Sequence, residues 1–230
     1  MAELSIIIPC LNEAKGIHFF LSQLQGLRAQ CELILVDGGS GDNTVQTAQP
    51  WVDLLIHCAP GRALQMNAGA EVASSPILLF LHADTFLPDD AIVKVQEAFS
   101  KGHLWGRFDI RLMGQHRLLT VISYFMNTRS AITGIATGDQ ALFVDKALFQ
   151  QVGGYPNIAI MEDISLSTIL KGLGRPYRVL SRVESSARRW QEFGVYKTVC
   201  LMWWLRLQYF LNVDPEQLAK QYQRGQFWKS

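Results

Sequence analysis

A regular alternation of short apolar runs with helical patterns is the feature that most constrains how this chain folds. Strand-like and helix-like segments take turns across the first hundred residues, which indicates βαβ units and a parallel sheet. The apolar runs show little polar alternation, as expected for strands that helices cover on both faces. The predicted strands are 4–9, 32–37, 53–58 and 77–84, and the predicted helices between them are 14–28, 43–49 and 62–73.

The order of elements loosens after residue 100, so we expect the sheet to become mixed there. A long helical pattern over 185–212 follows the last predicted strand, and Pro215 suits the first turn of a final helix at 215–222. We therefore expect one domain over 1–190, with halves that meet near residue 100, and a helical appendage over 191–230. The predicted strands of the second half are 105–112, 140–146 and 176–181, and its predicted helices are 116–131, 145–152 and 163–172.

Composition excludes some functional classes. The chain has 230 residues, of which 49% are hydrophobic and 18% charged, as in ordinary globular proteins. Its net charge of +1 and the lack of a Lys/Arg run argue against a nucleic-acid partner. Charge is unevenly distributed, because residues 1–170 sum to −6 and residues 171–230 to +7. The basic end fits three situations: contact with a phosphate-bearing ligand, contact with an anionic membrane, or a solvated helix face.

The four cysteines and the N-terminal sequence predict where the protein resides. Cys10, Cys31, Cys58 and Cys200 form no CxxC pair, and Cys10 and Cys200 have apolar neighbours, so we expect free core thiols in a reducing compartment. The N-terminal apolar run is too short for a signal peptide, and no apolar run reaches the ~18 residues of a spanning helix. We expect a cytoplasmic protein, either free or peripheral at the inner face of the membrane.

Polar side chains follow three of the predicted parallel strands. The carboxyl ends of such strands form one edge of the sheet, where ligands bind in open α/β folds. His82 and Asp84, two residues apart at the end of one strand, are expected on the same side of it, where a metal or a phosphate would fit. The candidate rim consists of Asn12, Glu13, Asp37, Ser40, Asp42, His82 and Asp84.

Seven segments carry a resemblance to a known family: SIIIPCLNE, ILVDGGSGDNT, GRALQMNAGAEVA, ILLFLHADT, GDQALFV, GGYP and MEDISLS. In order and spacing they are similar to the family-two, inverting, GT-A-type nucleotide-sugar glycosyltransferases, and to a small bacterial subgroup that has HAD where most relatives have an Asp-x-Asp triplet. The resemblance covers about 4–190. It implies a GT-A-type Rossmann-like fold with a nucleotide-binding half over about 1–100, an acceptor half over about 101–190, and a nucleoside-diphosphate sugar as donor.

The resemblance also implies roles on the donor side. It places Pro9, Asn12 and Glu13 near the base and ribose, and makes Asp37 the carboxylate that hydrogen-bonds the base or ribose. The alternative for Asp37 is a capped turn before two glycines. Arg62 opens a helix and is expected to meet phosphate through its guanidinium fork, unless it only pairs with surface acids.

A Mn²⁺ or Mg²⁺ ion is implied as cofactor, with Asp84 as its carboxylate ligand at the last position of the family's triplet. His82 stands where the family usually has aspartate. It fits a metal ligand, with imidazole better suited to Mn²⁺ than to Mg²⁺, or a hydrogen-bond donor to ribose or phosphate, or a structural histidine.

On the acceptor side the resemblance makes Asp163 the general base and gives Glu162 the role of orienting the acceptor or the base. An alternative is that both only complement the dipole of a helix start. Gly138, Asp139 and Gln140 are expected to form an acceptor-facing turn. The sugar and the acceptor, whether lipid-linked or saccharide, remain open.

The segment SSARRW, residues 185–190, is similar to the Gln-x-x-Arg-Trp element of processive relatives. Ser186 stands in place of the Gln, which favours one sugar per event. Arg189, with its neighbours Arg188 and Trp190, is expected to meet the diphosphate or to stack on the acceptor.

The aromatic-rich helix expected over 195–213 has three open interpretations: core packing, a homodimer interface, or contact with a membrane that carries the acceptor. A nucleotidyltransferase and a catalytically inactive nucleotide-sugar-binding module are the alternatives to transfer. The first of these would need an Arg/Lys-bearing, Gly-rich signature after the first strand, which PCLNEAKG lacks.

Overall fold

The computed structural model describes residues 3–224, and within them every side chain except those of residues 189 and 191. Eight strands form one mixed sheet, whose order across the sheet is β3-β2-β1-β4-β7-β6-β8-β5. The strands are β1 (Leu4–Cys10), β2 (Cys31–Asp37), β3 (Leu54–His57), β4 (Ile77–Phe80), β5 (Thr85–Phe86), β6 (Trp105–Met113), β7 (Phe143–Asp145) and β8 (Tyr177–Ser186).

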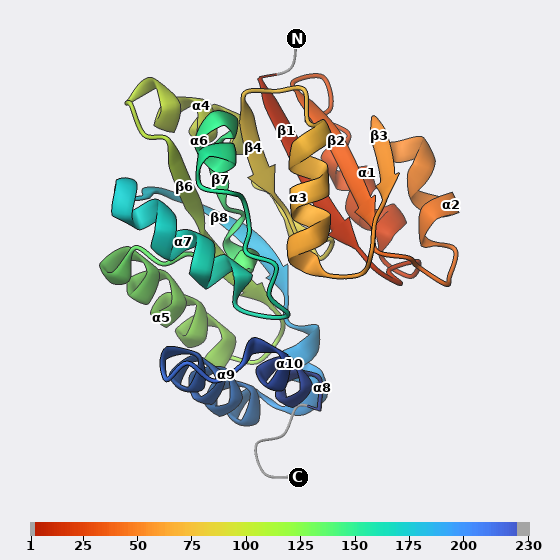
Figure 1. Ribbon diagram of the computed structural model, residues 1–230. Coiled ribbons are helices and arrows are strands. Elements are labelled where there is room, and N and C mark those ends of the chain that lie inside the picture. The colour runs from red at the N-terminus through yellow and green to blue at the C-terminus, as the bar shows by residue number, and fades with distance from the viewer. Residues whose placement is uncertain (1–2, 225–230) are drawn as a thin grey trace.

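The two halves of the sheet differ in direction, as the sequence predicts. Strands β3, β2, β1 and β4 are parallel, whereas β7 runs antiparallel to both β4 and β6. Strand β6 is parallel to β8, and β5 closes that edge antiparallel to β8. The carboxyl ends of the parallel strands point to the lower end of the molecule in Figure 1. That edge is where the fold would hold a ligand.

Helices cover both faces of the sheet (Figure 1). Side chains of α1 and α4 join the apolar core on one face, and side chains of α3, α6 and α7 join the core on the other. The helices up to residue 173 are α1 (Ile17–Leu24), α2 (Thr44–Ala48), α3 (Arg62–Val72), α4 (Ala91–Ser100), α5 (Leu118–Thr133), α6 (Lys146–Gln151) and α7 (Glu162–Leu173), with short 3₁₀ turns at Gln49–Trp51 and Gly138–Gln140.

Strand β1 shows why its sequence is apolar throughout. Ile6 and Ile8 belong to one core and Ile7 to the other, because successive side chains of a strand point to opposite faces. Helix α3 packs very closely on this strand: a Cβ built at Gly69 would lie 2.4 Å from Ile7 Cγ2. A glycine is therefore required there, and this packing fixes the start of α3 beside the ends of β1 and β2.

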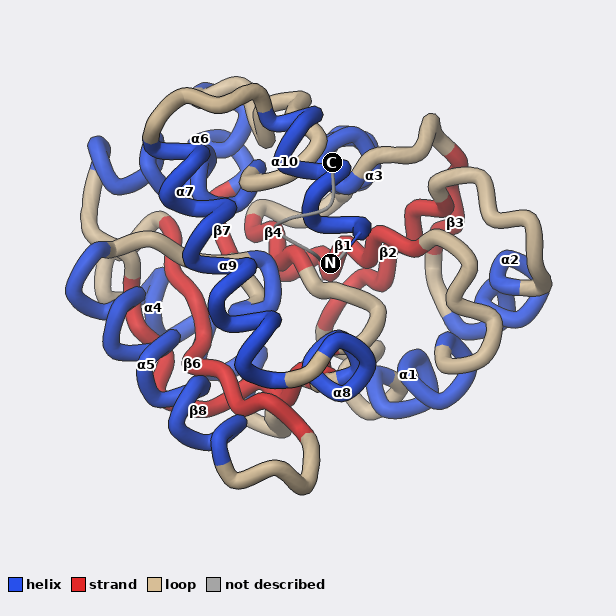
Figure 2. The backbone as a smooth tube through the Cα atoms, turned by 90° about the horizontal axis from the view of Figure 1, so that it is seen from below, coloured by secondary structure: helices blue, strands red, loops and turns tan. Residues whose placement is uncertain are grey.

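The C-terminal part differs from the sequence prediction. Strand β8 continues to Ser186, and the long helix expected over 185–212 is two helices, α8 (Arg188–Phe193) and α9 (Val195–Phe210). They separate at Gly194, whose φ of +84° lies outside the helical region. Helix α10 (Pro215–Arg224) follows. Figure 2, seen from below, shows α8, α9 and α10 on the viewer's side of the sheet, at the end where β1 and β2 finish.

Helix α9 is fastened to the segment that precedes α7. Buried Leu201 and Leu205 of α9 form a cluster with Met161, Ile164 and Leu218. The C-terminal helices thus touch the start of α7, where Glu162 and Asp163 lie.

The cysteines are free, and the expectation of core thiols is confirmed for two of them. Cys10 and Cys31 are buried, and burial raises the pKa of each thiol to about 12. Cys58 is half-buried and Cys200 is exposed, so the apolar neighbours of Cys200 in the sequence do not place it in the core. Within residues 3–224, no helix is long and apolar enough to cross a membrane.

Candidate active site

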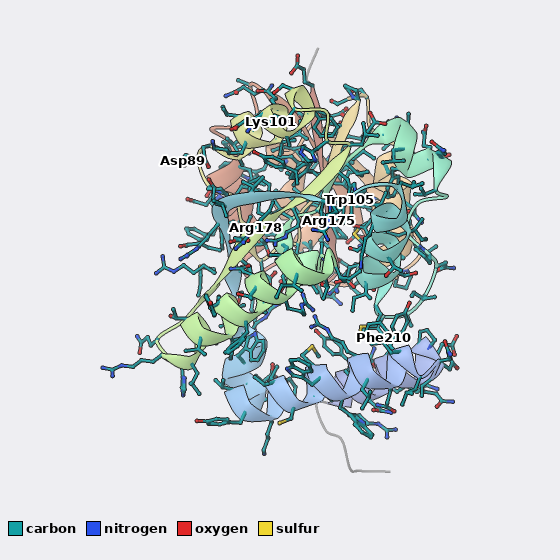
Figure 3. The ribbon with its side chains drawn as sticks, turned by 90° about the vertical axis from the view of Figure 1, so that its left-hand side faces the viewer. Asp89, Lys101, Trp105, Arg175, Arg178 and Phe210 are labelled. Atoms are coloured by element: carbon teal, nitrogen blue, oxygen red, sulfur yellow. The ribbon has the colours of Figure 1, made fainter. Side chains whose placement is uncertain are left out.

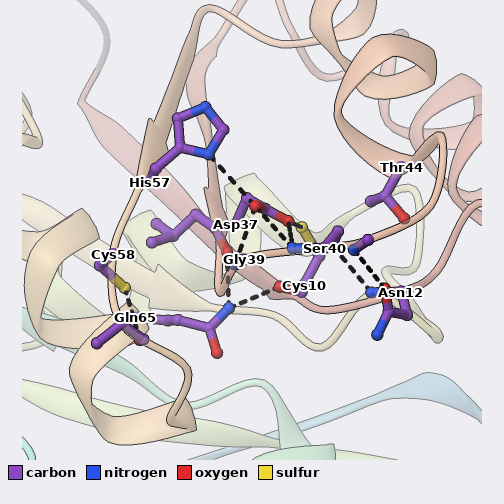
Figure 4. A network of polar contacts seen from close by, with 12 residues as sticks. Cys10, Asn12, Asp37, Gly39, Ser40, Thr44, His57, Cys58 and Gln65 are labelled. Atoms are coloured by element: carbon purple, nitrogen blue, oxygen red, sulfur yellow. Dashed lines mark hydrogen bonds and ion pairs between the residues drawn. The ribbon is translucent and has the colours of Figure 1, made fainter.

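The loops after β1 and β2 are joined by hydrogen bonds at the lower edge of the sheet (Figure 4). Ser40 Oγ accepts from the backbone N–H of Asn12, and Asn12 Oδ1 accepts from the N–H of Gly41, each at 2.9 Å. Thr44 Oγ1 accepts from the N–H of Glu13 at 2.8 Å. Asn12 itself has a φ of +55°, which asparagine tolerates better than most residues. The two loops therefore form one preformed surface.

Asp37, at the end of β2, holds the second of these loops. Its buried carboxylate accepts from the N–H groups of Gly39 and Ser40 at 3.0–3.2 Å, and His57 Nδ1 lies 3.3 Å away. Burial pushes the pKa of Asp37 up, but hydrogen bonds from Ser40, Gly39 and His57 outweigh it and leave the pKa below its ordinary value. Asp37 is thus ionised and held in place at the rim. It has a structural role in addition to any role in ligand binding.

Gln65 was not singled out by the sequence, yet it joins the ends of both strands. Its amide nitrogen donates to the carbonyls of Cys10 and Val36 at 2.7 and 2.8 Å. Gly38 lies directly against this amide, because a Cβ built there would be 3.1 Å from Gln65 Cδ. The one feature of the sequence that could have indicated this role is its position three residues after Arg62, on the face of α3 that packs on the sheet.

Pro9 is buried in β1 and is paired with Val36 of β2. The pairing of β1 with β4 ends at Ile7, so the missing N–H of the proline falls where β1 has one neighbour only. Pro9 is thus a buried part of the sheet near the end of β1.

His82 and Asp84 do not share one side of a strand, which corrects the sequence prediction. Strand β4 ends at Phe80, and the N–H of Thr85 donates to the carbonyl of His82 at 3.0 Å, so residues 82–85 form a turn. The period-two rule, from which a common side was expected, holds only while the chain stays extended, so it does not apply to this turn.

The His82 ring packs against Gly138 of the 3₁₀ turn. A Cβ built at Gly138 would lie 2.6 Å from both Cε1 and Nε2 of the ring, and His82 Nε2 is buried without a hydrogen-bond partner. Burial, together with the charge of Arg62, lowers the pKa of His82 to about 3. The imidazole is therefore neutral, and its free nitrogen faces the turn that carries Asp139.

Asp84 is half-exposed and lies beside Arg188 of α8, with Nη2 and Oδ2 4.0 Å apart. The same guanidinium reaches both carboxylate oxygens of Glu13, at 3.2 and 3.4 Å. Burial raises the pKa of Asp84 above its ordinary value, against the opposing charge of Arg188. The structure thus brings Glu13, Asp84 and Arg188 together, and the side chain of Arg189, predicted to share this role, lies outside the described residues.

Arg62, the first residue of α3, pairs with a buried carboxylate rather than with surface acids. Its Nη1 lies 3.6 Å from Glu162 Oε1, while the Glu162 side chain is only 5% exposed. Burial and the neighbouring Asp163 raise the pKa of Glu162 to about 7, against the opposing charge of Arg62. The start of α3, in the first half of the chain, therefore meets the start of α7, in the second half.

Asp163 lies at the start of α7 and faces the 3₁₀ turn. Its Oδ2 accepts from the N–H of Gly138 at 2.7 Å, and its Oδ1 accepts from the N–H of Ile164. The turn is closed by a reciprocal pair of hydrogen bonds between Thr137 and Gln140. Asp163 and the expected acceptor-facing turn are thus in direct contact.

Two arginines near this turn were not singled out by the sequence. The charges of Asp139 and Asp163 act on both Arg129 of α5 and Arg206 of α9, and burial lowers the pKa of Arg129 to about 10. Arg129 Nε and Nη2 and Asp139 Oδ1 are buried without hydrogen-bond partners. Burial also raises the pKa of Asp139. An arginine inside an otherwise apolar helix was the only sequence signal for Arg206.

Backbone strain is concentrated in the same segments. Asn12, Ala141 and Met161 are three of the four non-glycine residues with positive φ between residues 3 and 224. They follow β1, follow the 3₁₀ turn and precede Glu162, respectively. Such conformations cost ~1–3 kcal/mol each and gather at functional sites.

The described residues contain no group of three or more His, Cys, Asp or Glu placed to hold a metal ion. A metal that one carboxylate and the phosphates of a ligand share needs no such group. Half-exposed Asp84 fits that arrangement. The Nε2 of His82 lies beside Gly138 without a hydrogen-bond partner, and a role for His82 as a second metal ligand stays a prediction.

Comparisons with known proteins point to one family. The sequence profile described as Glycosyl transferase family 2 matches residues 5–145. An uncharacterised glycosyltransferase of Mycobacterium tuberculosis is 32% identical over an alignment of 169 residues, and the match covers 66% of this chain and 62% of that protein. The chain thus spans about three fifths of the length of that relative.

Two solved structures share the fold. A mannosyltransferase of Pyrobaculum calidifontis in complex with GDP-Man and Mn²⁺ superposes with a TM-score of 0.62 at 18% identity, over 80% of this chain and 56% of that one. TarS of S. aureus in complex with UDP-GlcNAc gives a TM-score of 0.63 at 18% identity, over 82% of this chain and 59% of that one.

Proposed function

Because the chain belongs to glycosyl transferase family 2, we propose that it is an inverting glycosyltransferase that moves one sugar from a nucleoside-diphosphate sugar to an acceptor hydroxyl. The observation that carries the proposal is the meeting of two groups of side chains. Asp84, Glu13 and Arg188 lie at the ends of the parallel strands, and Asp163 lies across the His82–Gly138 contact from them.

The joined loops after β1 and β2 are suited to the nucleoside. Asp37, Asn12 and the backbone groups around them are already fixed by internal hydrogen bonds, so little order has to be gained when a ligand binds. The matched structures named above contain GDP-Man and UDP-GlcNAc, which supports a nucleotide-sugar donor here.

Asp84 would hold a divalent cation together with the diphosphate, and that cation would neutralise the negative charge that develops on the leaving diphosphate. The Mn²⁺ in the matched mannosyltransferase supports this part of the proposal. Among the described side chains, Arg188, 4.0 Å from Asp84, and Arg62 at the start of α3 are cations whose charges act on Asp84, so both would lie near that charge.

Asp163 would accept the proton of the acceptor hydroxyl as the hydroxyl oxygen forms its bond to the sugar and the bond to the diphosphate breaks. The N–H of Gly138 fixes one of its oxygens at 2.7 Å, so the carboxylate is held at the turn that would face the acceptor. Glu162, paired with Arg62, would keep α3 and α7 in register at this point.

The acceptor part of the proposal concerns the lower end of the molecule. Helix α9 contributes Arg206 to the surroundings of Asp163 while its outer side exposes large apolar residues. A lipid-linked or saccharide acceptor that enters beside α9 is therefore part of the proposal, as is a peripheral membrane contact or a dimer through this helix.

A donor-hydrolysis assay tests the proposal. Purified protein is incubated with UDP-, GDP-, dTDP- and CDP-sugars, with Mn²⁺ or with a chelator, and release of the nucleoside diphosphate is measured. We expect slow, metal-dependent release from at least one donor, which Asp84→Ala abolishes. Tight donor binding without any release under any condition would instead identify a catalytically inactive nucleotide-sugar-binding module.

A further inference from the structure

A cavity of about 180 Å³ lies away from the candidate active site, between the C-terminal ends of α5 and α7 and the paired strands β6 and β8. Figure 3 looks onto this side of the molecule and labels Arg175 and Arg178 there. Lys171, which also lines the cavity, follows Asp163 by eight residues of α7, or ~12 Å along the helix axis. The cavity is lined by Arg107, Ser130, Ala131, Ile132, Thr133, Gly134, Lys171, Arg175, Pro176 and Arg178.

The lining carries four cationic side chains and no acidic one. Arg107 and Arg178 are direct partners in the pairing of β6 with β8, an arrangement in which like charges repel. Both contact one carboxylate, that of Asp109. Lys171 and Arg175 add two further positive charges, so Asp109 cannot balance the group. An excess of positive charge at a concave surface favours an anionic ligand.

Two buried polar groups of the lining lack partners. Arg107 and Ser130 are each 1% exposed, and the Nε of Arg107 and the Oγ of Ser130 form no hydrogen bond. Buried polar groups without partners are unfavourable and call for an explanation. Neither atom is exposed, so a ligand in the cavity would accept hydrogen bonds from both once the atoms that cover them move aside.

We propose that this cavity is a second ligand site, which binds a phosphate group. A phosphate offers several acceptor oxygens at once, and guanidinium groups bind it through paired hydrogen bonds. The volume equals about six waters at ~30 Å³ each, enough for a phosphate and a small part of the molecule that carries it.

The simpler interpretation is that Lys171 only complements the dipole of α7, since it lies in the last turn of that helix. That interpretation leaves two observations without a cause: the fully buried Arg107 with its unpaired Nε, and the unpaired hydroxyl of Ser130. The site does not depend on the proposed transferase activity.

Calorimetric titration with inorganic phosphate tests the proposal, at constant ionic strength maintained with chloride and with the donor site saturated by a nucleoside diphosphate. We expect the parent to bind phosphate and the rim variant K171Q/R175Q to bind it on the order of tenfold more weakly. The matched control K197Q/R117Q removes one lysine and one arginine, both exposed, outside the cavity lining and should bind as the parent does.

Ser130→Ala provides an independent variant that keeps the fold. The Ser130 hydroxyl has no partner to lose, so the thermal midpoint should not fall, whereas phosphate affinity should drop. A parallel titration with a hexose phosphate identifies the source of the group: tighter binding than that of inorganic phosphate indicates a phosphorylated metabolite. The proposal is overturned if neither compound binds, or if K171Q/R175Q and S130A bind as tightly as the parent.

Discussion

At the scale of single residues, the carboxylate of Asp163 is the group on which the proposed chemistry depends. Asp163→Asn keeps the size of the side chain and an oxygen that can accept from Gly138, but it cannot take up a proton. We expect the transfer rate to fall on the order of 10²–10⁴-fold, with donor affinity nearly unchanged. Steady-state rates and donor titrations measure the two quantities separately.

Asp89→Asn is the matched control, because Asp89 is an exposed aspartate at the outer surface of the molecule (Figure 3), and it should behave as the parent. If Asp163→Asn instead unfolds more easily while its folded fraction transfers sugar at the parent rate, Asp163 only caps α7. The base would then be sought at Glu162 or Asp139.

Gly138 provides a second test at this scale. Any Cβ there would lie 2.6 Å from the His82 ring, so Gly138→Ala must displace either the ring or the N–H that binds Asp163. We expect a large loss of transfer with nucleotide binding retained. Gly172→Ala in α7 meets nothing within 4 Å and should keep full activity, with stability unchanged or higher by up to ~1 kcal/mol. Equal activity of the two variants would contradict the proposed contact.

The raised pKa of Glu162 predicts that the stability of the protein depends on pH. Its pKa rises from 4.5 to about 7 on folding, so between these values the folded state binds more protons than the unfolded state. The free energy of unfolding contributed by this group therefore falls as pH rises from about 4.5 to about 7. Denaturant unfolding across this range should show a smaller fall in Glu162→Gln than in the parent, and parallel curves would show that Glu162 is ionised throughout.

At the scale of elements, the joined ends of β1 and β2 depend on one side chain of α3. Gln65→Met keeps the volume but removes two hydrogen bonds to buried carbonyls, which we expect to cost ~1–3 kcal/mol in the free energy of unfolding and to weaken nucleotide binding. Gln23→Met, the same substitution at an exposed position of α1, should lie within ~0.5 kcal/mol of the parent. Equal unfolding curves for both variants would show that Gln65 does not stabilise the joined ends of β1 and β2.

The elements also show what periodicity can and cannot predict. The four parallel strands of the first half were predictable, because β1, β2 and β4 are rich in apolar residues and covered on both faces, and half-buried β3 at the edge still has an apolar run over 54–56. The end of β4 was not, because the turn at 82–85 depends on a backbone hydrogen bond rather than on the apolar pattern. The break at Gly194 was missed for a related reason, since one glycine in an apolar helical pattern does not show whether it ends the helix.

Residue roles that depend on partners from distant parts of the chain were still harder to predict from the sequence. Arg188 meets Glu13 across 175 positions, and Asp163 meets Gly138 across 25. A single sequence contains no signal for such distances. Gln65, which joins the ends of β1 and β2, and Arg129 and Arg206, which lie near Asp139 and Asp163, therefore emerged only from the structure.

At the scale of the whole molecule, the outer side of α9 exposes several large apolar side chains that the proposed site does not use. Tyr196, Trp203, Trp204, Leu207 and Phe210 are 44–73% exposed, although the helix also buries its inner side. A helix that is apolar on both sides is expected to be covered. We expect Trp203→Ser with Phe210→Ser to reduce either self-association or vesicle binding of the parent, by ultracentrifugation and liposome co-sedimentation. A parent that is monomeric and ignores vesicles would show that the face is simply exposed.

The central claim is that the edge formed by β1, β2 and the 82–85 turn binds a nucleoside diphosphate with a divalent metal. Thermal unfolding of the parent and of Asp84→Ala, with UDP, GDP, dTDP or CDP and with or without Mn²⁺, tests it most directly. At a ligand concentration of 100 Kd we expect ~2.7 kcal/mol of stabilisation from at least one nucleotide. Mn²⁺ should increase this stabilisation in the parent, and Asp84→Ala should lose only the metal-dependent part. Absence of stabilisation by every nucleotide, or the same metal dependence in Asp84→Ala as in the parent, would contradict the claim.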